Sequence, residues 1–182
     1  MSRKTTCIGA VLVMLVLVAA MQSDARGADT FSYKWWRVGF ETPIPFSEPI
    51  RLGLDAAALV SPPESGPGQG RLEITLAAVP KDLQESMGNN EKEILAFVKG
   101  TFLGTTNPAE SNAELSFMGR TCKGDVQKTN LPKPGELEIY LVPLANGDKV
   151  AVGLTRDLNT PAEDSRRVLD MVARTFKEIP EQ

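Results

Sequence analysis

The chain has 182 residues, a formal net charge of −3, no histidine and two cysteines, Cys7 and Cys122. The missing histidine excludes the usual serine–histidine and cysteine–histidine catalytic sites and the commonest zinc ligand. The scattered, mildly acidic charge argues against nucleic acid as a partner, because the phosphate backbone requires a basic surface. The sequence also contains no phosphate-binding glycine loop and no calcium-loop motif. It therefore predicts no catalytic residues, no metal and no cofactor.

The first 27 residues have the pattern of a removable export signal. Arg3 and Lys4 precede an uncharged run, CIGAVLVMLVLVAAM, which is short for a membrane span but typical of a secretory signal. An uncleaved anchor is the alternative interpretation. We expect residues 1–27 to be a signal peptide and residues 28–182 to be one periplasmic or secreted domain, with no stable membrane span after the signal is removed. Four cleavage points remain open: after Ala20, Ala25, Gly27 or Ala28.

The first half of the domain predicts three strands and a loop. Residues 33–40 (YKWWRVGF) are aromatic and β-branched enough for a first strand, and residues 50–54 follow three prolines as a short second strand. Residues 61–70 (SPPESGPGQG) are nearly all turn-forming and predict an exposed loop. In residues 71–79 (RLEITLAAV), apolar and polar positions alternate, which predicts a half-buried strand.

A helix and two further strands are expected next. Apolar residues at helical spacing predict a helix over 90–103, with Asn90 as its N-terminal cap. Residues 113–118 predict a strand, which a turn at Gly119-Arg120 connects to another strand over 121–128.

Asn146-Gly147 predicts a β-hairpin. A two-residue type I′ turn requires positive φ at both positions, and Asn-Gly is the preferred pair there. Centring the turn on these residues pairs Ile139 with Leu154, Leu141 with Val152 and Pro143 with Val150. All three apolar pairs then lie on one face of the hairpin, so the turn and the pattern predict the same register.

The last element is predicted to be an amphipathic helix that ends at Pro180. The start of this helix has the pattern of a capping box. Thr160 is the cap, Pro161 occupies the first helical position, and Glu163 follows three residues after the cap. The helix has one apolar stripe, which we expect to lie on the sheet. The stripe consists of Val168, Leu169, Val172, Phe176 and Ile179.

This order of elements over residues 33–179 resembles the PsbP-like fold, and within that group the exported bacterial DcrB-like proteins. The segments that carry the resemblance are RLEITLAAVPKDLQES, the helix after it, AELSFMGRTCKGDVQKT, the long hairpin and TPAEDSRRVLDMVARTFKEI. The resemblance implies an α+β fold with an antiparallel sheet flanked by helices, an α/β/α sandwich. It also implies a role in binding or assembly, and it supplies no catalytic residues.

Cys122 is the single thiol of the expected mature chain. Alternation over residues 121–126 places it on the apolar face with Gly124 and Val126, as a buried small side chain. A reactive thiol is the alternative, because Arg120 and Lys123 lie beside it and would lower its pKa. An intermolecular disulfide in an oxidising compartment is a third interpretation.

Trp35, Trp36 and Arg37 are the candidate binding residues. Adjacent residues of a strand point to opposite faces, so the two tryptophans cannot enter the same core. One indole is then available to anchor a sugar or a protein partner, unless a helix or loop covers it.

Two functions remain open from the sequence. The first is a noncatalytic exported protein that binds an envelope protein or a small ligand, for instance as an assembly or accessory factor. The second is a hydrolase or transferase that uses carboxylates, serine or Cys122 in an unrecognised site. A cleft with facing carboxylates or an exposed thiolate would favour the second function.

Overall fold

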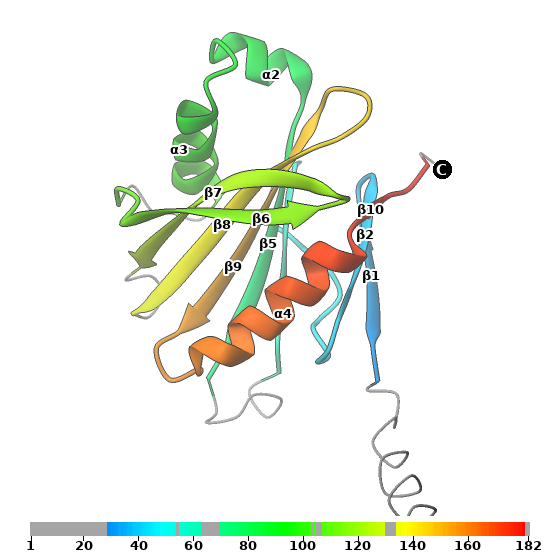
Figure 1. Ribbon diagram of the computed structural model, residues 1–182, viewed down its shortest axis with the longest axis vertical. Helices are drawn as coiled ribbons and strands as arrows, with labels where there is room; N and C mark the ends of the chain where they lie inside the picture. Colours follow the sequence, from blue (N-terminus) through cyan, green and yellow to red (C-terminus); the bar gives the residue numbers. More distant parts are fainter. Residues whose placement is uncertain are drawn as a thin grey trace, which may run out of the picture.

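Two antiparallel sheets and three helices form the described part of the chain (Figure 1). The computed structural model describes residues 29–53, 55–62, 70–102, 104, 107–129 and 134–180. The predicted signal peptide lies outside these residues, as does most of the predicted loop over 61–70. None of the helices in these ranges is long and apolar enough to cross a membrane. The α+β class, with a sheet flanked by helices, is confirmed.

The larger sheet has seven strands in the order β3-β4-β5-β9-β8-β7-β6, and each neighbouring pair is antiparallel. Its strands are β3 (Ile50–Arg51), β4 (Ala56–Val60), β5 (Leu72–Val79), β6 (Ser111–Phe117), β7 (Arg120–Thr129), β8 (Gly135–Pro143) and β9 (Lys149–Asp157). The smaller sheet, in the order β1-β2-β10, has β1 (Phe31–Trp35), β2 (Val38–Thr42) and β10 (Lys177–Glu178). The helices are α2 (Lys81–Ser86), α3 (Glu91–Phe102) and α4 (Ala162–Thr175).

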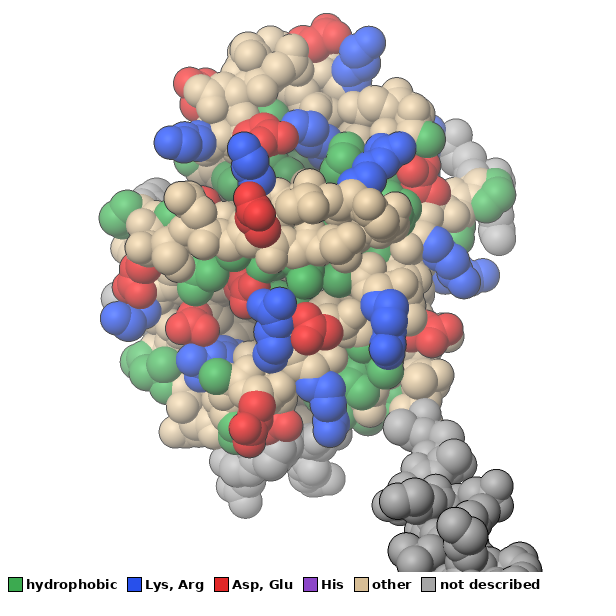
Figure 2. Space-filling model, viewed as in Figure 1, with side chains coloured by type: hydrophobic (Ala, Val, Ile, Leu, Met, Phe, Trp, Pro, Cys, Tyr) green, Lys and Arg blue, Asp and Glu red, His purple; other side chains and the backbone are tan. Residues whose placement is uncertain are grey.

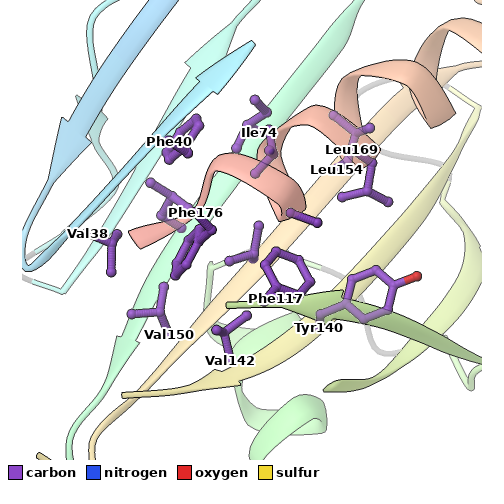
Figure 3. Close-up of a cluster of buried hydrophobic side chains, with 14 of the residues drawn as sticks. Val38, Phe40, Ile74, Phe117, Tyr140, Val142, Val150, Leu154, Leu169 and Phe176 are labelled. Carbon is purple, nitrogen blue, oxygen red and sulfur yellow. The ribbon is translucent and has the colours of Figure 1, made fainter. Parts of the chain in front are cut away.

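One face of the larger sheet packs against α4 and the β1–β2 hairpin (Figure 3). Inward side chains of β5, β8 and β9 meet the buried stripe of α4, and the rings of Phe117, Tyr140 and Phe176 lie among them. Phe117 contacts Phe176 edge to face, with ring centroids 5.5 Å apart, and lies 5.7 Å from Tyr140. This face therefore holds the larger, aromatic core of the domain.

The opposite face packs against α3. The buried apolar side of α3 lies on alternate residues of the central strands, including Leu137 and Ile139. This side of the helix consists of Ile94, Leu95 and Val98. Because both faces of the sheet are covered, β5 is buried along nearly all its length. The strand was predicted in the right place, but the prediction that it is half-buried is wrong.

The N-terminal segment is a hairpin, which the sequence did not predict. Residues 33–40 do not form one strand, because the chain reverses at Trp36-Arg37 and β2 returns along β1, with Trp35 opposite Val38. The strand expected over 50–54 is reduced to the two residues of β3. The structure also adds β4 and α2, which no periodic pattern had indicated.

The β8–β9 hairpin forms as predicted, but its register is shifted by one residue. Ile139 pairs with Gly153, Leu141 with Ala151 and Pro143 with Lys149. The loop closes by a hydrogen bond from Leu144 N to Asp148 O, and Gly147 N donates to Leu144 O. Gly147 has φ +92°, whereas Asn146 is absent from the positive-φ residues. The connection is thus a three-residue loop with a left-handed glycine, not the predicted type I′ turn.

The C-terminal helix was predicted correctly in its buried stripe but not in its ends. The Thr160 side chain is buried and its hydroxyl lies 3.5 Å from Arg71 O, so it forms no cap. The helix begins at Ala162 and ends at Thr175, and Ile179 follows β10. The predicted capping box and the predicted end at Pro180 are therefore wrong.

The middle of the chain agrees with its predicted elements. Asn90 caps α3, because its Oδ1 accepts a hydrogen bond from Lys92 N at 3.1 Å. β6 and β7 form the expected strand pair, although the turn lies at Met118-Gly119, one residue earlier than predicted, with φ of 50° and 75°. Gly124 allows β7 to pass close to β8, since a Cβ there would collide with Ile139 O and the Tyr140 ring.

Candidate functional site

Trp36 is held in an unusual conformation at the β1–β2 turn. Trp36 and Arg37 form the two-residue connection between the paired residues Trp35 and Val38. The φ of Trp36 is 50°, in the left-handed region where glycine or asparagine is normally found. The residue is 38 % exposed. A bulky residue in this region costs backbone strain, and such strain is concentrated at functional sites.

Trp35 has a different environment from Trp36. It is half-buried and packs on the core beside α4. The two indole rings have centroids 6.1 Å apart and planes at 46°. The two tryptophans do not share one core, as expected, but the reason differs from the predicted one. Trp36 is exposed because it lies in the turn, not because it occupies the outer face of a strand.

Arg37 connects the exposed indole to the rest of the molecule. Its guanidinium lies over the Trp36 ring, 5.4 Å from the centroid, in a cation–π arrangement. Its Nη1 also lies 3.4 Å from Asp148 Oδ2 in the β8–β9 loop. The three predicted binding residues are thus adjacent in space, but only Trp36 presents a large exposed apolar surface.

Asp148 anchors this turn to two other elements. Its Oδ1 accepts a hydrogen bond from Lys81 N, at the start of α2, at 3.0 Å, and its Oδ2 accepts one from Asn146 Nδ2 at 2.6 Å. A second link comes from Ile179 N, which donates to Arg37 O at 2.8 Å. We refer to Trp36, Arg37 and Asp148 as the tryptophan turn. Contacts from distant parts of the chain hold its conformation, and no local pattern predicted Asp148 as a member.

Cys122 is buried in the core beside α4, with 3 % of the residue exposed. Its Sγ lies 3.6 Å from Arg120 O. Burial is the largest influence on the thiol and raises its pKa above the ordinary value, whereas the nearby Arg120 charge lowers it by less. A raised pKa reduces the thiolate population, which is the opposite of what an activated nucleophile requires.

A groove between α3 and the β6–β7 strands gathers acidic and basic side chains. It has a volume of about 400 Å³, and its lining includes the carboxylates of Glu91, Glu114 and Asp125. Each of them lies near a cation: Asp125 bonds Lys99 at 2.8 Å, Glu91 bonds Lys149 at 3.2 Å, and Glu114 is opposite Lys123 in the strand register. Within the described ranges, no three acidic or cysteine side chains are grouped to hold a metal. Two of the three carboxylates are thus in ion pairs, and Glu114 lies opposite a lysine in the strand register.

Comparison of the chain with family models and with curated proteins finds no match.

Proposed function

We propose that this chain is an exported, noncatalytic protein that binds a partner in the cell envelope through the tryptophan turn. The observation that carries the proposal is the exposed indole of Trp36, kept at φ 50° by the anchors of its own turn. Glycine would fit that backbone without strain, so the indole needs a reason outside folding. Exposed tryptophan and arginine are the side chains most enriched at binding hot spots.

The geometry of the turn favours a protein as the partner. Trp36 lies in a two-residue connection between strands, and an exposed indole with a guanidinium over it can enter a pocket on another protein. A small ligand would instead be enclosed by the chain that binds it. The same proposal has three further parts. They are export by residues 1–27, processing to residues 28–182, and membership of the PsbP-like fold near the DcrB-like proteins. They are supported by the sequence pattern and by the layout of sheet and helices.

The alternative of a carboxylate, serine or thiol enzyme is not favoured by any specific observation on the described residues. Cys122 is buried, and Glu91 and Asp125 of the groove are in ion pairs with lysines.

Affinity capture from a native envelope extract tests the proposal. Immobilised wild-type protein is compared with Trp36→Gly, and Leu158→Ser is the matched control because Leu158 is a more exposed apolar residue, at 58 %, in the turn after β9. Trp35 stays unchanged, since its replacement would disturb the core. We expect Trp36→Gly to lose the captured partner and Leu158→Ser to retain it. Retention of every partner by a folded Trp36→Gly protein would refute the proposal.

A further inference from the structure

β6 is an edge strand whose outer backbone faces away from the sheet. In the part of the chain that the structure describes, it pairs with β7 alone and is the last strand of the larger sheet. The two-residue turn places Phe117 opposite Arg120, and the residues that flank such a turn exchange backbone hydrogen bonds. Counted back from Phe117, every second residue of β6 therefore also forms backbone hydrogen bonds with β7. The backbone groups of Asn112, Glu114 and Ser116 consequently point outward.

This edge has few of the features by which proteins prevent strand pairing. β6 has seven residues, whereas β3 at the opposite edge has two. Its sequence, SNAELSF, contains no proline and no lysine, and Glu114 is its only charge. Asn112, Glu114 and Ser116 are exposed. In Figure 2 a band of backbone and uncharged polar side chains crosses the middle of the molecule, interrupted by an acidic side chain.

Two hollows flank the strand, one on each face. The groove beside α3, described above, includes Asn112, Glu114 and Leu95 in its lining. A second hollow of about 350 Å³ lies beside α4 and is lined by Leu115, Met118 and Ala173, with Asp170 and Arg174 at its side. Side chains of an added strand point alternately to the two faces, so they would enter these two hollows in turn.

We propose that β6 is a strand-addition site for an extended segment of a partner protein that carries a basic residue opposite Glu114 and apolar residues on either side of it. The basic residue would form a cross-strand charge pair, and its neighbours would enter the hollow lined by Leu115 and Met118. A second copy of this chain fits less well, because antiparallel pairing of two β6 strands in full overlap places Glu114 against Glu114. This site is separate from the tryptophan turn and does not depend on it.

A displayed library of random heptapeptides, selected on the full-length chain, tests this proposal. Enriched peptides are measured against wild type, Glu114→Pro and Glu114→Thr. Proline removes an outward N–H that β7 does not use, whereas threonine removes the carboxylate and keeps that N–H. Both variants should therefore fold, as circular dichroism would verify. We expect at least about a tenfold loss of affinity with Glu114→Pro and a smaller loss with Glu114→Thr.

Backbone N-methylation of an enriched peptide gives a second measurement that requires no variant protein. Methylation at every second residue should abolish binding, and methylation at the residues between them should be tolerated, because only alternate amides face β6. Failure to enrich peptides, equal affinity for wild type and Glu114→Pro, or a methylation pattern without alternation would overturn the proposal. Self-association of wild type that Glu114→Pro abolishes would identify a second copy as the occupant and would also overturn it.

Discussion

The two faces of the larger sheet are covered by helices that achieve burial in different ways. On the α4 face, aromatic and branched side chains fill the core, and the charges of α4 remain on its outer side. On the α3 face the core is smaller, and Lys99 is buried with its ammonium 2.8 Å from Asp125. Because the larger apolar core lies on the α4 face, we expect most of the stability of the domain to come from that face. The α3 face includes a buried ion pair whose net contribution is small but whose disruption is costly.

Removing an aromatic ring from the α4 face is expected to lower the free energy of unfolding the most. Phe117 is fully buried between Tyr140 and Phe176. Phe117→Ala should lower the free energy of unfolding by about 3–5 kcal/mol, because it removes apolar burial and leaves a cavity. Urea denaturation measures this loss. A loss below about 2 kcal/mol would show that the aromatic core is not the main source of stability.

Breaking the ion pair on the α3 face should have the next largest effect. The Lys99 side chain is only 7 % exposed, so Asp125→Ala would leave a buried ammonium without its carboxylate and should cost about 3 kcal/mol. Adding Lys99→Met should recover most of that loss, since a methionine of similar length needs no partner. The double-mutant cycle is read from urea denaturation. Strictly additive losses would contradict the coupling between the two side chains.

Tyr140 is expected to make a smaller, pH-dependent contribution to the free energy of unfolding. Its ring lies in the α4-face core, and its hydroxyl points out of the cluster and donates to Glu138 (Figure 3). Burial, followed by the Glu138 contact, raises the pKa of Tyr140 well above its ordinary value of 10. The folded state therefore retains the proton longer than the unfolded state. The stability from this group is complete below pH 10 and is lost as the pH rises above it.

Tyr140→Phe tests this pH dependence. The variant should be less stable than wild type by about 1 kcal/mol near neutral pH, because it lacks the hydrogen bond to Glu138. Above the ordinary tyrosine pKa the difference should shrink, since only wild type pays the cost of ionisation there. Unfolding free energies at about pH 8 and about pH 11 measure it. A constant difference across that range would show that Tyr140 does not titrate as expected.

The sequence predicted the elements that depend on local periodicity. The alternation of residues 71–79 identified a real strand, although both faces of that strand are buried. The apolar stripe identified the C-terminal helix, because one side of that helix enters the core. The hairpin register could not be obtained in this way. Residues 139–142 of β8 and 150–152 of β9 are buried on both faces and are all apolar. Periodicity there does not distinguish two registers that differ by one residue.

The candidate site was predicted in part. The sequence identified Trp35, Trp36 and Arg37, but it placed them in one strand, because Trp-Arg has no intrinsic preference for a turn. The reversal at Trp36 depends on Asp148, Lys81 and Ile179, which are distant in the chain. Such long-range anchors have no local signal. For the same reason, the outward edge of β6 became apparent only from the order of the strands.

The unfolding free energy of Trp36→Gly measures whether Trp36 is retained for binding and not for folding. Glycine relieves the strain at φ 50°, which is worth about 1 kcal/mol, although the stacking with Arg37 is lost. We expect the stability of Trp36→Gly to lie between that of wild type and about 1 kcal/mol higher. A fall of more than about 1 kcal/mol would contradict it, because Trp36 would then be a structural residue of the turn.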